Sequence, residues 1–197
     1  SNDVLQLILM PTEACNFRCV YCYEDFSHGR MAPHVVRGVK EFLAVRAPGL
    51  ASLTLSWFGG EPLLARDIIE EILEHARSLT AQHPGMRLVS DITTNAWLLT
   101  RPVFSRLLDL GVSRYQISFD GPKEWHDKKR VLAGGGGTFD RIWQNLLAMR
   151  EEPREFAITV RLHVDKENHE ALPRFIEEFQ ESFGHDARFK LFIRPLS

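Results

Sequence analysis

The stretch CNFRCVYCYE (residues 15–24) places Cys15, Cys19 and Cys22 in a C-x-x-x-C-x-x-C pattern, shortly after the apolar segment VLQLILM (residues 4–10). These three are the chain's only cysteines. Three thiolates at this spacing can bind three irons of a cubic [4Fe–4S] cluster and leave the fourth iron open to a small molecule. The pattern therefore predicts a reactive iron–sulfur site in a loop that follows a first strand.

Two other interpretations of the cysteines are open. Positions i, i+4 and i+7 share one face of a helix, so the three side chains would also suit a small apolar patch in a core. A zinc ion is the second alternative, with His28 or His34 as the fourth ligand, although structural zinc sites usually separate two short ligand pairs by a longer gap. The grouping of every cysteine within eight residues favours the cluster.

The composition indicates one globular domain. The chain has 197 residues, of which 44% are hydrophobic and 25% charged, and no apolar run approaches 18 residues. The formal net charge of −2 lacks the basic excess of a nucleic-acid-binding protein. We therefore expect neither a nucleic-acid nor a membrane partner, and the clustered thiols favour the reducing cytoplasm.

Apolar segments of two kinds alternate along the chain. Short segments with branched residues predict strands at about 4–10, 53–58, 87–94, 114–119, 156–164 and 188–194. Amphipathic helices are expected between them at about 34–45, 67–79, 102–110, 138–147 and 168–183, with Thr138 and Asn168 as caps of the last two. This alternation predicts an α/β fold of repeated βα units around a parallel sheet.

Polar or glycine-rich groups follow four of the predicted strands. In order, they are the cysteine loop, Gly59-Gly60-Glu61-Pro62, Thr94-Asn95-Ala96, and Asp120-Gly121 just after Ser118. Because ligands of parallel βα folds bind at the carboxyl ends of the strands, we expect one site at this edge. Glu61 beside glycine backbone would suit an ammonium group, whereas an ordinary βα turn is the alternative interpretation.

The cysteine pattern, with the aromatic Tyr21 before its last cysteine, resembles the cluster motif of the radical S-adenosylmethionine (SAM) enzymes. The resemblance implies a partial (β/α)6 barrel of parallel strands, here without its last helix. It also implies two cofactors, a [4Fe–4S] cluster and SAM, which binds the open iron. One electron from the reduced cluster then splits SAM into methionine and a 5′-deoxyadenosyl radical that abstracts hydrogen from the substrate. A flavodoxin or ferredoxin is the implied electron donor.

Two further motifs extend the resemblance over nearly the whole chain. GGEP (residues 59–62) resembles the family's motif for the amino group of SAM. ISFDGPKEWHDKKR (residues 117–130) resembles the anaerobic sulfatase-maturating enzymes and related SPASM-type peptide maturases. The resemblance implies that these residues bind SAM: Tyr21 at the adenine, Gly59, Gly60 and Glu61 at the amino group, and Asn95, Ser118, Asp120, Arg130 and Leu196 at the remaining parts. His126 and Arg130 are one helical turn apart and could both bind substrate, but a solvent-exposed helix face is the favoured interpretation.

Two features depart from the family pattern. Ala96 stands where the family's threonine-asparagine-glycine motif has glycine, and no cysteine for an auxiliary cluster follows Cys22. We therefore interpret residues 1–197 as the radical SAM core, with the auxiliary-cluster domain absent or cut off and with Ser1-Asn2 as a cloning remnant. The expected function is hydrogen abstraction from a peptide or protein side chain. The same chemistry on a small molecule, or a non-catalytic zinc-binding module, are the alternatives.

Overall fold

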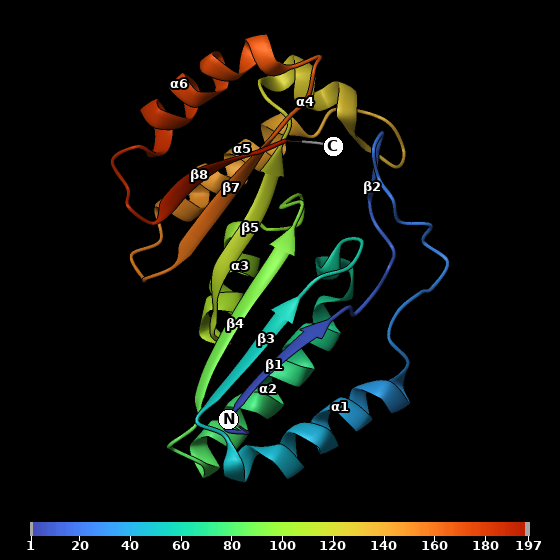
Figure 1. Cartoon of the computed structure of the whole chain (residues 1–197), viewed down its shortest axis with the longest axis vertical. Coiled ribbons are helices and arrows are strands. Elements are labelled where there is room, and N and C mark those ends of the chain that lie inside the picture. Colours follow the sequence, from blue (N-terminus) through green and yellow to red (C-terminus); the bar gives the residue numbers. More distant parts are fainter. Residues whose placement is uncertain (1, 196–197) are drawn as a thin grey trace.

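The computed structural model describes residues 2–195, so Leu196 lies outside the described residues. Six parallel strands form one curved sheet in the order β1-β3-β4-β5-β7-β8 (Figure 1). Their bounds are Val4–Leu9 (β1), Ser52–Trp57 (β3), Arg87–Thr94 (β4), Val112–Phe119 (β5), Ala157–Val164 (β7) and Phe189–Pro195 (β8). In this part of the chain β1 and β8 do not pair with each other, so the sheet is a partial barrel with an open side.

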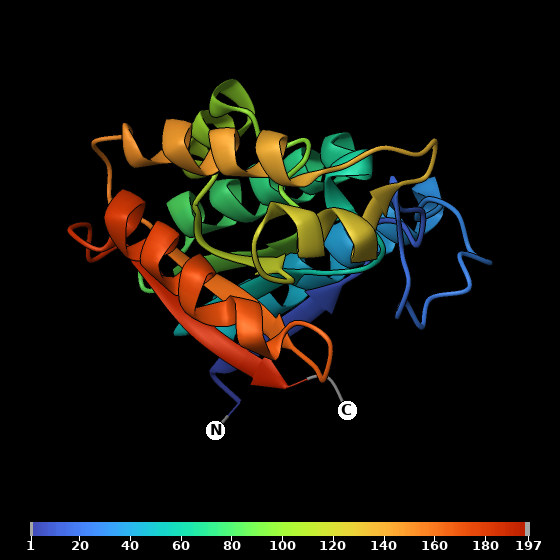
Figure 2. The same cartoon turned by 90° about the horizontal axis from the view of Figure 1, so that it is seen from above.

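Helices cover the outer face of the sheet (Figure 2). They are α1 (Pro33–Arg46), α2 (Arg66–Gln82), α3 (Arg101–Asp109), α5 (Phe139–Arg150) and α6 (Leu172–Phe183), with short 3-10 turns at Ala47–Gly49, Pro62–Ala65 and His169–Ala171. A further short helix, α4 (Lys123–Lys129), lies beyond the carboxyl end of β5 (Figure 1). None of the described helices is both long and apolar enough to span a membrane.

Alternation along the strands separates the core from the barrel interior. On β3, Leu53, Leu55 and Trp57 are buried toward the helices, as successive side chains of a strand point to opposite faces. Polar residues occupy the other face, where Ser56 accepts a hydrogen bond from Gln6 and donates one to Asp91. The sequence therefore builds an apolar outer layer and a polar interior.

The six predicted strands and five predicted helices are confirmed to within a few residues at their ends. The predictions omitted α4 and a small antiparallel pair, β2 (Phe17–Cys19) with β6 (Arg130–Leu132). This pair joins the cysteine loop to the segment after β5, with Cys19 opposite Arg130. Three-residue strands carry too little alternation for the sequence pattern to reveal them.

Thr138 is the N-cap residue of α5, as predicted, whereas Asn168 caps the short turn before α6 and not α6 itself. Thr138 precedes α5 but its side chain makes no capping bond; Asp127 Oδ1 instead accepts from the N–H groups of Thr138 and Phe139. Asn168 precedes the turn before α6, and its amide binds backbone carbonyls of Asp120 and His163. The Thr138 hydroxyl and the Asn168 amide instead satisfy buried backbone carbonyls outside their own helices, which outweighs the local preference for a side-chain cap.

Candidate active site at the carboxyl edge of the sheet

A pocket of about 460 Å³ at the carboxyl ends of the strands brings together most of the predicted site residues. Its lining includes Cys15, Cys19, Cys22, Tyr21, Gly59, Gly60, Ser118 and Arg130. Three predicted residues, Glu61, Asn95 and Asp120, are buried behind this wall and do not line it. The predicted set therefore divides into residues that face the pocket and residues that support them.

The cysteine loop is held at its ends and exposes its last thiol. The ring of Phe17 is buried, and its N–H lies 3.4 Å from Cys15 Sγ. Cys22 is exposed, whereas Cys15 and Cys19 are partly buried. Burial raises the pKa of the Cys15 thiol to about 11 and also raises that of Cys19. Metal binding would convert these thiols to thiolates.

Gly59 and Gly60 allow two backbone segments to touch. Gly59 has φ 125°, and a Cβ there would lie 2.4 Å from Thr12 O. At Gly60 a Cβ would lie 2.2 Å from Glu13 O and 2.5 Å from Ala14 O. The glycine pair thus packs directly on the base of the cysteine loop, where no other residue type fits without movement of the backbone.

The Glu61 carboxylate connects the ends of β3 and β4. Oε1 accepts from Thr94 Oγ1 at 2.7 Å and from the Leu63 N–H at 3.1 Å, and Oε2 accepts from the Asn95 N–H at 2.7 Å. Burial raises the pKa of Glu61, and these hydrogen bonds oppose the shift only in part. The Glu61 side chain therefore links two strand ends inside the protein, and both of its carboxylate oxygens already accept hydrogen bonds from the protein.

Asn95 supports the cysteine loop from β4. Its Nδ2 donates to Asn16 Oδ1 at 2.8 Å and lies 3.9 Å from Cys15 Sγ. Its Oδ1 accepts from the Trp97 N–H at 3.0 Å. The next residue, Ala96, is buried with φ 61°, a conformation that glycine adopts more readily.

A polar network surrounds the Tyr21 hydroxyl. It donates to Asp120 Oδ2 at 2.7 Å and accepts from Arg130 Nη1 at 2.7 Å, with His163 Nδ1 at 3.2 Å. Burial alone would raise the pKa of Asp120, but the nearby His163 ring, the charge of Arg130 and the hydrogen bond from Tyr21 outweigh it, so the pKa is lowered. The network fixes the aromatic ring against the pocket.

Two buried atoms of this network, Arg130 Nε and Asp120 Oδ1, lack a hydrogen-bond partner within residues 2–195. His163 Nδ1 lies 3.3 Å from Asp120 Oδ1. A buried N–H without an acceptor is costly, and its presence at a pocket wall indicates a place for a ligand. Arg130 can therefore offer this N–H to an acceptor atom of a bound molecule.

His126 supports Arg130 from behind, and the expectation that it lies on a solvent-exposed face is wrong. The ring is fully buried against Phe119, and Nε2 lies 2.9 Å from Thr138 Oγ1. That hydroxyl donates to the Arg130 carbonyl at 2.6 Å. Burial lowers the pKa of His126 to about 3, so the ring is neutral. The short α4 turns this histidine inward, which a seven-residue helix leaves hidden in the sequence.

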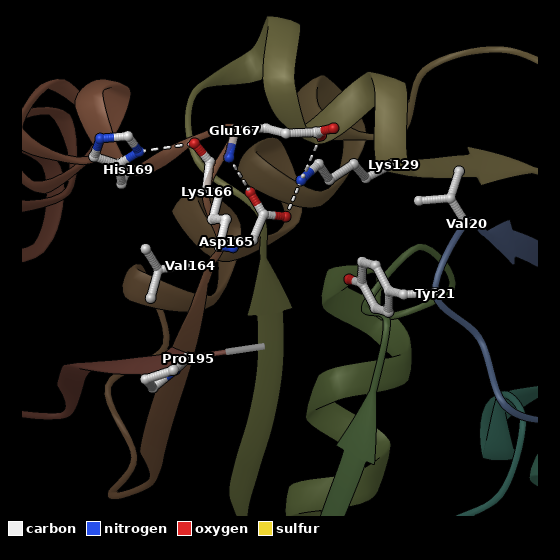
Figure 3. A pocket seen from close by; sticks show the side chains of 9 residues that line it. All are labelled: Val20, Tyr21, Lys129, Val164, Asp165, Lys166, Glu167, His169 and Pro195. Carbon is white, nitrogen blue, oxygen red and sulfur yellow. Dashed lines mark hydrogen bonds and ion pairs between the residues drawn. The ribbon is translucent and has the colours of Figure 1, made fainter. Parts of the chain in front are cut away.

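A second pocket of about 800 Å³ also has Tyr21 in its lining (Figure 3). The buried Lys129 forms ion pairs with Asp165 and Glu167 there, while its carbonyl accepts from the Val20 N–H at 3.0 Å. The loop after β7 is thereby tied to the cysteine loop through one residue. This pocket shares Tyr21 and Pro195 with the first.

The polar residues of the site that were not predicted include Arg161 and His163 on β7, Arg194 on β8, and Asn168. A signal for the first two was present in AITVRLHV (residues 157–164), where polar residues alternate with apolar ones. In a strand with one face on helices, the polar positions must face the barrel interior. No sequence signal distinguishes Asn168 from a helix cap.

Comparison with known proteins defines the class. Residues 9–179 match the family model of the Radical SAM superfamily. The match includes the three clustered cysteines at the carboxyl edge of the partial barrel. The chain belongs to this superfamily of enzymes. The non-catalytic zinc-binding alternative is therefore wrong.

Among the relatives are a probable GTP 3′,8-cyclase of Metallosphaera sedula and a PqqA peptide cyclase of Bradyrhizobium diazoefficiens. The first is 32% identical over 191 residues, covering 94% of this chain and 54% of the relative, and the second is 26% identical over 175 residues, covering 88% and 42%. A solved structure of native anSMEcpe with bound AdoMet and the Kp18Cys peptide superimposes with a TM-score of 0.76 at 21% identity, covering 98% of this chain and 51% of that one. The chain thus spans about half the length of the proteins it matches.

The cofactors of the superfamily are a [4Fe–4S] cluster and SAM, and the pocket suits them. Three cysteines line it, each available to a different iron, and no three Cys, His, Asp or Glu side chains of the described chain converge on a point that would hold one metal ion. Gly59 and Gly60 also line this pocket, and Arg130 has a buried Nε–H without a partner among the described residues. Donor type and spacing both fit a cluster with a bound small molecule.

Proposed function

We propose that this chain is the catalytic core of a radical SAM enzyme that abstracts hydrogen from a side chain of a peptide or protein. When bound, the cofactors supply reductive cleavage of SAM and the hydrogen abstraction that follows from it. The observation that carries the proposal is the open barrel. Because β1 and β8 leave one side of the described sheet unclosed, a chain larger than a metabolite can reach the cysteine pocket.

The residues have two proposed roles. Cys15, Cys19 and Cys22 hold the cluster, and Tyr21 supports the adenine. Gly59 and Gly60 give SAM access to backbone, while Ser118 and Arg130 take its carboxylate; the Arg130 N–H and guanidinium charge suit that group. Glu61, Asn95 and Asp120 act through these residues, as their side chains are engaged behind the wall. Leu196 keeps its proposed contact with SAM outside the described residues.

The peptide substrate is supported by the likeness to a peptide cyclase and to a structure that holds a peptide. Reduction of the cluster is assigned to a flavodoxin or ferredoxin in the cytoplasm. A second candidate, a small-molecule substrate, is favoured by the 32% identity with a probable GTP cyclase. Both candidates use the same pocket and differ in what enters the barrel.

Isotope transfer separates the two candidates. The cluster-loaded protein is incubated with SAM, reductant and either a perdeuterated peptide digest or a perdeuterated nucleotide mixture, and deuterium in 5′-deoxyadenosine is measured by mass spectrometry. We expect deuterium transfer from the peptides and none in Cys19→Ala. Transfer from the nucleotides alone would replace the peptide proposal by the small-molecule one.

A further inference from the structure

The β7–β8 wall of the pocket carries two arginines, Arg161 and Arg194. Neither Arg161 nor Arg194 forms a hydrogen bond or ion pair with any residue from 2 to 195, although both line the cysteine pocket. Most other arginines near this edge are engaged; Arg130, for example, contacts Tyr21 and lies 3.9 Å from Asp120. Two such guanidinium groups in one pocket indicate a place for an anion that residues 2–195 do not supply.

The register of the strands places these arginines together. His163 pairs with Arg194 and Arg161 with Phe192 in the parallel β7–β8 ladder, so the two arginines are diagonal neighbours on one face of the sheet. Burial together with the charges of Arg194 and Arg130 lowers the pKa of Arg161, in agreement with the close placement that the strand register gives. Within residues 2–195, no carboxylate forms an ion pair with Arg161 or Arg194 to relieve this repulsion.

On β1, β3 and β4, polar side chains of the barrel interior are hydrogen-bonded to one another. There Gln6, Ser56 and Asp91 form a hydrogen-bonded chain across β1, β3 and β4, so Asp91 is already engaged. Glu24 is the only ionisable acid that lines the described pocket, and it pairs with neither arginine. The described lining of this pocket therefore holds three arginines, Arg130, Arg161 and Arg194, and one carboxylate, that of Glu24.

The cofactor does not account for both arginines. SAM has one carboxylate, for which Arg130 with its free N–H is already suited, and it also carries an ammonium and a sulfonium group. Its net charge is therefore positive, and the negative charge of the thiolate-bound cluster offsets it. An additional anion is required to neutralise Arg161 and Arg194.

We propose that Arg161 and Arg194 bind a carboxylate of the peptide substrate, and so select peptides with an acidic group close to the residue that reacts. This inference rests on the proposed peptide function and names its specificity. Two planar guanidinium groups can bind one carboxylate with several charge-assisted hydrogen bonds. The exposed ring of Phe192, opposite Arg161 on the same face, gives the neighbouring part of the peptide an apolar surface.

A binding experiment tests the proposal without turnover. Synthetic hexapeptide pools with one Glu or one Gln at the same position, each with a C-terminal amide, are retained by the cluster- and SAM-loaded protein and quantified by mass spectrometry. We expect about tenfold higher retention of the Glu pool, since charge-assisted hydrogen bonds are about twice as strong as neutral ones. A third pool with Gln and a free C-terminal acid distinguishes a terminal from a side-chain carboxylate.

The variants are Arg161→Gln, Arg194→Gln and the double variant, with Lys190→Gln as the matched control. Lys190 lies on the same face of β8 as Arg194 but outside the pocket lining. The Glu preference should fall in each arginine variant, vanish in the double variant and persist in the control. SAM affinity, measured by calorimetry, should change less than about twofold.

Several results would overturn the proposal. Equal retention of the two pools by the wild-type protein would refute the acidic specificity and leave the peptide function intact. If neither pool were retained, both the acidic specificity and the proposed peptide function would be refuted. A tenfold loss of SAM affinity in Arg161→Gln would assign this arginine to the cofactor, and displacement of the Glu pool by equimolar GTP would assign the pair to a phosphate-bearing small molecule.

Discussion

Glu61 and Asp120 are both buried carboxylates that follow parallel strands, yet the chain surrounds them in opposite ways. Glu61 accepts hydrogen bonds from one hydroxyl and two backbone N–H groups, and burial raises its pKa. Asp120 contacts Tyr21 and lies near Arg130 and His163, which outweigh burial and lower its pKa. Glu61 thus holds together the backbone segments that support the cysteine loop, whereas Asp120 contributes a negative charge next to Arg130 in the pocket wall.

The largest expected effect tests the backbone side of this comparison. Gly60→Ala would push a Cβ to 2.2 Å from Glu13 O, so the cysteine loop must move. We expect loss of iron binding and a decrease of at least about 2 kcal/mol in the free energy of unfolding, measured by iron analysis and urea denaturation. The control is Gly134→Ala, where a Cβ meets nothing within 4 Å. Normal iron content in Gly60→Ala would contradict the tight packing.

The second prediction compares the two carboxylates directly. Asp120→Asn removes the carboxylate closest to the buried Arg130 and should cost about 3 kcal/mol, as expected when a buried charge loses its partner. Glu61→Gln keeps one acceptor and leaves no cation unpaired, so about 1 kcal/mol is expected. Urea denaturation of the cluster-free proteins at neutral pH measures both. An equal or larger loss in Glu61→Gln would show that the two sites do not differ in this way.

The third prediction is a pH dependence of opposite sign. Because the pKa of Glu61 is raised from 4.5, its stabilising contribution is complete below that pH and is lost as the pH rises toward the folded-state value. The pKa of Asp120 is lowered from 3.8, so its contribution is complete above that pH and is lost as the pH falls further.

Differences between wild type and variant isolate these terms. The stability difference from Glu61→Gln should shrink above pH 4.5, and that from Asp120→Asn should shrink below pH 3.8, each by at most about 1.4 kcal/mol per pH unit. Urea denaturation across this range gives both curves. Two curves with slopes of the same sign would refute the assignment.

The smallest expected effect concerns Ala96, which follows Asn95, a hydrogen-bond partner of Glu61. Its φ of 61° favours glycine, but the buried methyl group of alanine offsets part of that preference. Ala96→Gly should therefore remain within about 1 kcal/mol of wild type, whereas the β-branched Ala96→Val should lose more than about 2 kcal/mol. Thermal unfolding of the pair provides the measurement. A valine variant as stable as wild type would exclude backbone strain at this position.

Most of the fold was predictable because it depends on periodicity. AITVRLHV alternates over eight residues, and α2 repeats its apolar residues at helical spacing, so element type and sheet direction follow from the pattern. The β2–β6 pair and α4 were missed because three to seven residues provide less than two periods. Their existence depends on contacts between segments far apart in the sequence.

The site was predictable where chemistry is concentrated in short motifs. The cysteines, Tyr21 and the glycine pair were named from the sequence, and the structure brings them to one pocket. Whether a polar side chain faces the pocket or supports it was not predictable, as for Glu61 and Asn95. The burial of each side chain decides which of these roles it has, and that burial is established only when several strand ends come together in the fold.

The most direct test of the account is electron paramagnetic resonance of the anaerobically reconstituted and reduced protein, with and without SAM. Three cysteines that leave one iron open predict a reduced [4Fe–4S] signal that shifts when SAM binds. In Arg130→Gln the cluster signal should persist while the SAM concentration needed for the shift rises. A cluster whose signal is indifferent to SAM in the wild-type protein would contradict the central claim that this pocket binds both cofactors together.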